Sequence, residues 1–271
     1  MKSISLRLTL LIACAIVPIL YILLPIAHLF VDTSPASMLK SWIDPELLTA
    51  VATSLLSAAT ATILSLCFGL QAAFLISIAR FPGKWLLETL LLLPLILPPI
   101  VGGVALVDLF GPYAFIGQWT AARGVMLTNS IWGIVLAQWY ITGPFLIVTA
   151  EAGFRAVPSE FREAAILDGA DLLTQFRKIY TPLSQKAIVA GTALTFARAV
   201  GEFGATMLMA YHPYTLPVDI WVQFTANGVS GMIPIACGAI LVMAICLGIG
   251  RWVVRVRQGH QREPSSSASP W

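Results

Sequence analysis

The chain repeatedly carries apolar runs that are long enough to cross a lipid bilayer, which takes about 18 residues or more in a helix. Its composition agrees, because 58% of the residues are hydrophobic and 11% are charged. A soluble domain has roughly 45–50% apolar and 25% charged residues. The sequence therefore predicts an all-α integral membrane protein with the bilayer as its solvent. Six transmembrane helices are expected, over residues 8–31, 47–79, 85–110, 130–150, 187–210 and 232–250.

Basic residues near the ends of these spans predict the orientation, because cytoplasmic loops carry an excess of Lys and Arg. If the N-terminus is cytoplasmic, only Lys40 and Arg123 fall on the outer side, and Arg198 lies inside the fifth span. The remaining basic residues then face the cytoplasm: Lys2, Arg7, Arg80, Lys84, Arg155, Arg162, Arg177, Lys178, Lys186, Arg251, Arg255, Arg257 and Arg262. We therefore expect both termini in the cytoplasm, together with the loop between spans 4 and 5.

Proline and glycine interrupt the third predicted span. Pro94, Pro98 and Pro99 shortly precede Gly102 and Gly103. In a membrane helix such residues kink or unwind the backbone and free polar groups that need partners or water. The sequence predicts a kink here, which either lines a cavity or is tolerated by neighbouring helices.

The spans and their connections divide the chain into three parts. Residues 1–46 are predicted to form an N-terminal transmembrane helix with an outward loop, and residues 47–257 the main transmembrane domain. Residues 258–271 are expected to be a disordered cytoplasmic tail, because they contain few apolar side chains.

The cytoplasmic loop carries a gapped motif. Glu163-Ala164-Ala165 is followed after three residues by Gly169, and after nine more by Ile179-Tyr180-Thr181-Pro182. This pattern resembles the Glu-Ala-Ala loop of the membrane subunits of bacterial ABC importers, E-A-A, three residues, G, nine residues, I-x-L-P. The departure is Thr181, where the family usually has Leu. The resemblance implies a binding-protein-dependent, type I importer permease, with residues 47–257 as its permease domain and this loop as its coupling helix.

The residues of the loop independently favour two short helices around a turn. Pro158 suits the first helical turn, Glu160 complements the helix dipole, and Gly169 can end the helix. Asp171 can cap a second helix, which Pro182 is expected to stop.

Small side chains give this corner little bulk, so that it can enter a groove on a partner protein, with charged residues at its rim. An amphipathic loop on the membrane surface is the alternative. The predicted docking residues are Arg162, Glu163, Ala164, Ala165, Asp168, Gly169, Ala170 and Pro182.

The chain has no G-x-x-x-x-G-K-[ST] motif to cradle the phosphates of ATP, and no spacing typical of a metal site or a catalytic group. The resemblance implies that two copies of a separate ATPase subunit bind ATP and Mg²⁺, and that this chain carries no cofactor. It also implies a homodimer of this chain, an extracytoplasmic substrate-binding protein, and a place in the inner membrane of a bacterium. The basic residues are dispersed, which argues against nucleic-acid binding.

A second motif lies in the fifth predicted span, where residues 197–206 read Ala-Arg-Ala-Val-Gly-Glu-Phe-Gly-Ala-Thr. This stretch is similar to Ala-Arg-x-x-Gly-Glu-Phe-Gly-Ala-Thr of the molybdate permeases, which have close relatives among the sulfate permeases. The resemblance implies that the transported solute is an oxyanion. Molybdate is the first choice, with tungstate and sulfate as alternatives.

Four polar residues of this span are predicted to share one helical face: Thr195, Arg198, Glu202 and Thr206. Ionisable groups at membrane depth are costly and face protein or a water-filled path. This face is therefore predicted to form part of the translocation path or its gate. Arg198 and Glu202 are four residues apart and can also pair with each other as a structural clamp between helices.

Other functions remain open at this point. The chain can be a permease for another small solute such as ferric ion or thiamine, or a proton-coupled secondary transporter that uses buried carboxylates as relays. An intramembrane enzyme would need Glu202 or Asp108 as acid or base, but no second carboxylate lies at a catalytic spacing. Only the importer accounts for the cytoplasmic loop motif.

Overall fold

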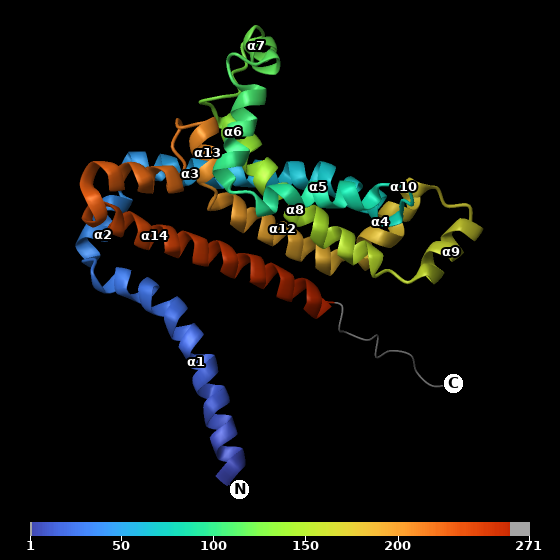
Figure 1. Ribbon diagram of the computed structural model, residues 1–271, viewed down its shortest axis with the longest axis horizontal. Coiled ribbons are helices and arrows are strands. Elements are labelled where there is room, and N and C mark those ends of the chain that lie inside the picture. The colour runs from blue at the N-terminus through green and yellow to red at the C-terminus, as the bar shows by residue number, and fades with distance from the viewer. Residues whose placement is uncertain (1, 261–271) are drawn as a thin grey trace. The chain divides into compact units, whose positions relative to one another are not determined.

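The computed structural model describes residues 2–260, which form helices and turns without a β-strand (Figure 1). This confirms the predicted all-α class. Its described residues divide into two compact units, the first made of those up to residue 48 with 220–241, and the second of residues 49–219 with those from 242 on.

The smaller unit contains α1 (Lys2–Val31), α2 (Pro35–Trp42), the start of α3 (Pro45–Leu64) and the central part of α14 (Leu216–His260). The thiol of Cys237 in α14 donates to the carbonyl of Leu29 in α1, 3.3 Å away. The ring of Trp42 lies directly on Gly238, where any side chain would overlap the indole. By contrast, α1 is 0% buried over Leu11–Val31, as expected of an apolar helix that meets lipid or another chain.

The second long run forms one helical stretch. It consists of α3, the π-helical turn η1 (Ser65–Gly69) and α4 (Leu70–Ile78), and Pro45–Ile78 is long and apolar enough to span a membrane. The π turn adds one residue to the helix and turns Ser65 and Gly69 inward, where both are buried.

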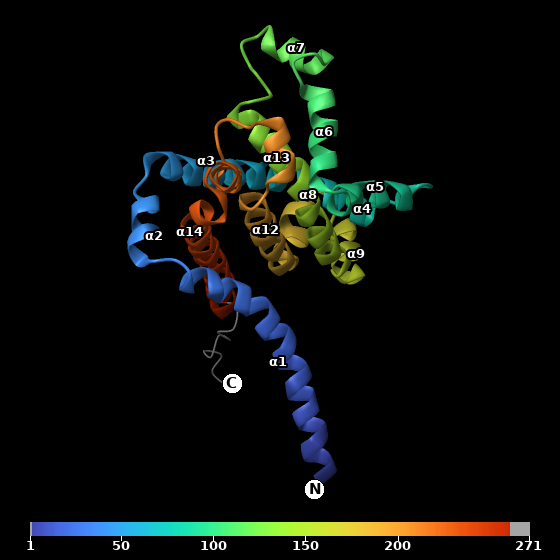
Figure 2. The same cartoon turned by 60° about the vertical axis from the view of Figure 1, so that its left-hand side comes forward.

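The third predicted span is broken into α5 (Lys84–Ile96) and α6 (Pro99–Phe110), which meet at an angle of 109°. Figures 1 and 2 show α6 leading away from α5 to the short helix α7 (Phe115–Ala121). The break lies at Pro98, which has no N–H and precedes Pro99 at the start of α6. Gly102 and Gly103 remain helical, so the chain breaks at the prolines and not at the glycines.

Helix α8 (Ile131–Arg155) is the centre of the larger unit and packs against α4, α5, α6, α12 and α13. Its side chains Ile134 and Leu146 are 0% exposed, and Phe154 is 1% exposed. The elements that follow α8 are α9 (Ser159–Leu167), α10 (Leu172–Gln175), the π turn η2 (Phe176–Tyr180), α11 (Thr181–Leu183), α12 (Gln185–Val200) and α13 (Gly204–Met209).

Four helices of the described residues can cross a membrane by length and composition: Leu11–Val31, Pro45–Ile78, Ile131–Arg155 and Leu216–Cys246. The bent α5–α6 pair makes a fifth if it is one span. The fifth predicted span, 187–210, is not one helix, because the chain breaks between α12 and α13.

The last span also differs from its prediction. Helix α14 begins at Leu216 rather than near residue 232, and it is kinked at Gly228, whose φ is 69°. The polar residues before the kink lower the hydropathy of this part, which is why the sequence predicts a loop there. The predicted tail starts at residue 258, whereas α14 ends at His260, and residues 261–271 lie outside the described part of the chain.

Candidate functional site

The break between α12 and α13 is built around a buried ion pair. Arg198 lies in the last turn of α12, and its Nη1 is 2.6 Å from Oε2 of Glu202 in the break. The Glu202 side chain is 1% exposed, and its Oε1 accepts the backbone N–H of Ala205 at 3.0 Å. The carboxylate is therefore ion-paired through Oε2, which accepts no hydrogen bond within the described residues, and it accepts an N–H at the start of α13 through Oε1.

This geometry corrects the prediction that Thr195, Arg198, Glu202 and Thr206 share one face of a continuous helix. The helix ends at Val200 because Glu202 caps the next helix instead of continuing the first. Arg198 and Glu202 still pair, so the predicted contact is present.

The two threonines lie in helix packing. Thr195 is 0% exposed, and its hydroxyl is 3.5 Å from the carbonyl of Thr142 in α8. Thr206 is also fully buried in α13, and its hydroxyl has no hydrogen-bond partner among the described residues. Thr206 is thus one of a small group of buried polar atoms that are left unsatisfied near the break.

A buried amide on α8 belongs to the same group. Gln138 is 0% exposed, and neither Oε1 nor Nε2 has a partner within the described part of the chain. Helix α8 packs against both α12 and α13. An unsatisfied buried polar group costs about 1–3 kcal/mol, so these groups need an explanation other than stability. The sequence gives only a weak signal for Gln138, because polar residues in membrane helices usually bond to neighbouring helices.

The predicted coupling loop has the expected local structure. Helix α9 runs over Ser159–Leu167 directly after Pro158, and Gly169 follows with a φ of 74°. A residue in this left-handed conformation ends a helix. Glycine adopts the conformation readily, whereas a residue with a Cβ is strained in it. The backbone N–H of Thr174 donates to Asp171 at 2.8 Å and caps α10. The hydroxyl and the amide of Thr174 lower the pKa of the Asp171 carboxyl.

Most of the predicted docking residues lie on the surface of the loop, but two differ from their expected roles. Ala165 is only 6% exposed, and its carbonyl accepts the N–H of Ala170, so it packs inward rather than toward a partner. Pro182 does not stop the helical path, because it lies in the first turn of α11, where its missing N–H is not needed. The exposed members are Glu163, Ala164, Asp168, Gly169 and Pro182, with Arg162 and Ala170 half-buried.

The loop also exposes a set of large apolar side chains, which we call the docking patch. Leu167 is 88% exposed, and the other members are between 48% and 54% exposed. The sequence could have revealed them, because five large apolar residues fall in a segment that the charge pattern places outside the membrane. The docking patch consists of Phe161, Ile166, Leu167, Leu172 and Leu173.

The far end of the loop is anchored in an aromatic cluster. The ring of Tyr180 lies 5.0 Å from that of Phe74 in α4 and 6.2 Å from that of Phe154 in α8. Phe176 also packs on Phe74, at 5.1 Å between ring centroids. Ile188 of α12 completes the buried core of the cluster. The far end of the loop is thus packed against α4, α8 and α12.

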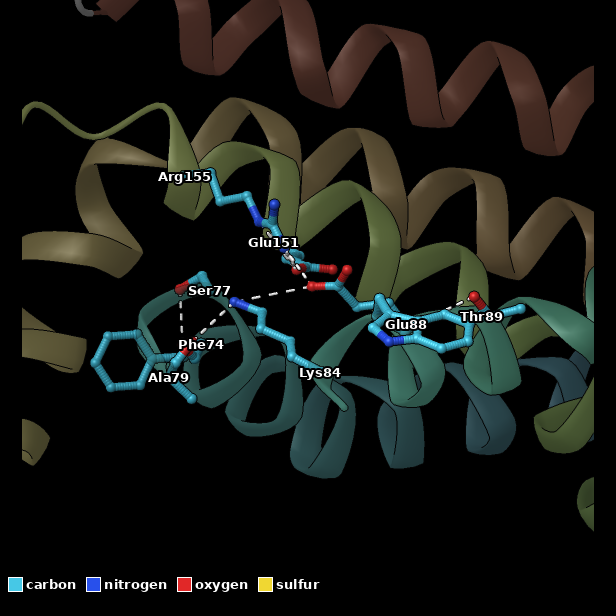
Figure 3. Close-up of polar contacts among 9 residues, drawn as sticks. Phe74, Ser77, Ala79, Lys84, Glu88, Thr89, Glu151 and Arg155 are labelled. Carbon is cyan, nitrogen blue, oxygen red and sulfur yellow. Dashed lines mark hydrogen bonds and ion pairs between the residues drawn. The ribbon is translucent and has the colours of Figure 1, made fainter. Parts of the chain in front are cut away.

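An ion network, not apparent from the sequence, joins the start of α5 to the end of α8 (Figure 3). Arg155 donates to Glu151, at 2.6 Å, and to Glu88 on α5. The Lys84 ammonium lies 3.8 Å from Glu88 and donates to the carbonyl of Ala79 at 3.0 Å. Glu88 and Arg155 are 67 residues apart in sequence, so no local pattern predicts their contact. Within residues 2–260, no group of three His, Cys, Asp or Glu side chains is placed to hold a metal ion.

Comparison with known proteins gives a consistent assignment. Residues 65–258 match the family described as the binding-protein-dependent transport system inner membrane component. The chain is 42% identical over 252 residues to a probable molybdenum ABC transporter permease protein of Haloferax volcanii, and the match covers 90% of this chain and 91% of that protein. It is 36% identical over 211 residues to the sulfate transport system permease protein of Salmonella typhimurium, which covers 77% of this chain and 74% of that protein.

A solved structure has the same fold. A chain of the bacterial alginate ABC transporter, in complex with an alginate pentasaccharide-bound periplasmic protein, superposes with a TM-score of 0.72 at 14% identity. The superposition covers 92% of this chain and 93% of that chain. At this identity the likeness shows the fold alone.

Proposed function

Since the chain belongs to the inner membrane components of binding-protein-dependent transport systems, we propose that it is the pore-forming subunit of an ATP-driven oxyanion importer. Two copies form the translocation path, and each docks one ATPase subunit on the cytoplasmic side. The ATPase subunits bind ATP and Mg²⁺, so this chain needs no cofactor of its own. An extracytoplasmic binding protein delivers the oxyanion on the other side of the inner membrane.

The docking patch is the observation that carries this proposal. Exposing five large apolar side chains within residues 161–173 is unfavourable in water, and exposed apolar surface of this kind marks sites of protein association. Glu163 and Asp168 lie exposed beside the patch, so the surface has an apolar centre and a charged rim. A short helix with this pattern fits a groove on a partner protein.

The aromatic cluster supports a mechanical role for the same loop. Tyr180 and Phe176 connect the loop to the ends of α4 and α8 through close ring contacts. Interdigitated packing of this kind moves as a body rather than deforming. Closure of the ATPase subunits would therefore rotate α4, α8 and α12 together and alternate the access to the path.

The break between α12 and α13 is the proposed gate, with Thr195, Arg198, Glu202 and Thr206 around it. The Arg198 side chain is 34% exposed although Glu202 is buried, so its guanidinium can meet an anion from one side. Glu202 is held by Arg198 and by the Ala205 N–H, which reduces its repulsion of an oxyanion. Gln138 offers a further amide for a hydrogen bond to the solute.

Molybdate is the proposed solute, with tungstate and sulfate as the alternatives. The relative in Haloferax volcanii is named for molybdenum and that in Salmonella typhimurium for sulfate. Molybdate and sulfate are both tetrahedral dianions of similar chemistry. Uptake of labelled molybdate, competed by excess sulfate or tungstate, distinguishes them.

The docking proposal is tested by a substitution at the most exposed residue of the patch. Leu167→Arg places a charge where the partner's groove should be apolar, and we expect the co-purified ATPase subunit to fall by about tenfold or more, as for an interface hot spot. Leu167→Met keeps the size and polarity and is the matched control. Undiminished ATPase in the Leu167→Arg complex would instead indicate a loop that lies on the membrane surface.

A further inference from the structure

A basic pocket lies beside the coupling loop, outside the docking patch and the gate. It has a volume of about 240 Å³ and is formed where α4 ends, α5 begins and α8 passes into α9. Four cationic side chains line it, Arg80, Lys84, Arg155 and Arg162, and among the described residues no acidic side chain does. The other lining residues are Ser77, Ile78, Ala79, Phe154, Val157, Ser159 and Tyr180.

The charges around this pocket do not balance. Lys84 and Arg155 are paired with Glu88 and Glu151, so the ion network of Figure 3 is neutral. Arg80 and Arg162 form no ion pair within residues 2–260. Two guanidinium groups around one pocket are suited to the oxygens of a phosphate group, which Arg binds through its planar fork of donors.

An apolar groove begins at the same place. It has a volume of about 290 Å³, lies between α5 and α8, and shares Arg155 with the basic pocket. Its charged lining residues are Glu88, Glu151 and Arg155, toward the start of α5 and the end of α8, and all its other lining residues are apolar. These are Leu91, Leu92, Ile147, Val148 and Ala152.

We propose that the pocket and the groove together bind a phosphate-bearing anion, supplied by an anionic phospholipid of the cytoplasmic leaflet. The phosphate lies between Arg80 and Arg162, and an acyl chain lies in the groove. Basic pockets between helices on the cytoplasmic side are suited to such headgroups, because the surface potential of that leaflet is negative. A free oxyanion would use the same guanidinium groups but would leave the apolar groove unexplained.

The site bears on coupling because Ser159 and Arg162 are in the first residues of α9. A bound headgroup would fix the base of the coupling loop to the membrane surface. The inference rests on the cytoplasmic position of the loop in the proposed function, and not on which solute is transported.

The test is to count the lipids retained by the full-length protein. The protein is purified with whatever subunits accompany it, exchanged into vesicles of phosphatidylcholine with or without phosphatidylglycerol, and analysed by native mass spectrometry. We expect wild-type protein to retain phosphatidylglycerol, and the double variant Arg80→Gln with Arg162→Gln to retain about tenfold less. The control, Arg177→Gln with Lys178→Gln, removes two exposed charges outside the pocket and should behave as wild type. Equal retention by all three proteins, or no preference over phosphatidylcholine, would overturn the proposal.

A second variant distinguishes the two sources of the anion. Val148→Trp fills the groove from a position that is 37% exposed, so the fold should tolerate it. We expect weaker retention of phosphatidylglycerol by this variant. Displacement of the lipid by inorganic phosphate, with no effect of Val148→Trp, would assign the pocket to a free oxyanion and refute the lipid site. Because retention is measured whether or not an ATPase co-purifies, failure of this inference is distinguishable from failure of the proposed function.

Discussion

Removing one partner of the Arg198–Glu202 pair should destabilise the protein, and removing both should recover part of the loss. Arg198→Ala leaves the Glu202 carboxylate buried, with only the Ala205 N–H to stabilise it. Glu202→Ala leaves a guanidinium that is already one-third exposed, and also removes the cap of α13. The two single variants therefore fail for different physical reasons.

The magnitudes follow from the burial of each group. An uncompensated buried charge costs about 3–5 kcal/mol, which applies to Arg198→Ala because Glu202 is 1% exposed. The loss for Glu202→Ala should be smaller, about 2–3 kcal/mol, since Arg198 reaches solvent and the cap contributes about 1 kcal/mol. In the double variant neither charge remains, so the total should fall short of the sum by about 1–3 kcal/mol.

The assay is a double-mutant cycle on protein purified in detergent, with unfolding followed by the change in helical circular dichroism. Glu202→Gln separates the two roles, because its amide oxygen can still accept the Ala205 N–H while the charge is lost. We expect it to be less damaging than Glu202→Ala. Strictly additive losses in the cycle would refute the pair as a coupled unit, and a Glu202→Gln protein as unstable as Glu202→Ala would refute the cap.

Three further outcomes are expected. Gly103→Val should cost about 1–3 kcal/mol of stability by overpacking, since a Cβ there would lie 2.9 Å from Cα of Ala205. A thermal unfolding temperature equal to that of wild type would show that α6 and α13 separate more easily than this contact implies. Arg155→Ala should cost less than about 1 kcal/mol, as for other exposed ion pairs, and a larger loss in the same assay would mean that the network is structural. The cap of α10 should be present above the ordinary Asp pKa of about 4 and lost as pH falls through the lower pKa of folded Asp171. The measurement is the protection of the Thr174 amide, its hydrogen-exchange rate relative to the intrinsic rate at each pH, which should fall with the cap. A protection that Asp171→Ala leaves unchanged would contradict the cap.

Local signals in the sequence predict the coupling loop well. Gly169 ends α9 through its own left-handed backbone conformation, and Asp171 caps α10 by accepting a nearby amide N–H. Each role depends only on the residue type and its close neighbours in the sequence. The Arg198–Glu202 contact is equally local, because residues four apart face each other in a helix. The role of Pro182 is harder to predict, because a proline can either end one helix or begin the next.

The features that the sequence does not predict depend on distant contacts or on competing local preferences. Glu202 interrupts the apolar pattern of residues 187–210 as a single charged residue, which a continuous helix can also carry, so the hydropathy does not show that its carboxylate accepts the Ala205 N–H at a helix break. Pro98 and Pro99 predict a kink, but its angle of 109° is set by how α6 packs on α8 and α13. The pairing of Glu88 with Arg155 requires the tertiary fold.

The central claim is that this chain moves an oxyanion at the expense of ATP hydrolysed by a docked subunit. The most direct measurement is uptake of labelled molybdate into vesicles that contain the purified complex and its binding protein, with ATP supplied on the cytoplasmic side. The account predicts uptake that requires ATP, persists when the proton gradient is collapsed, and is lost in Leu167→Arg but not in Leu167→Met. Uptake that follows the proton gradient without ATP would contradict it and indicate a secondary transporter.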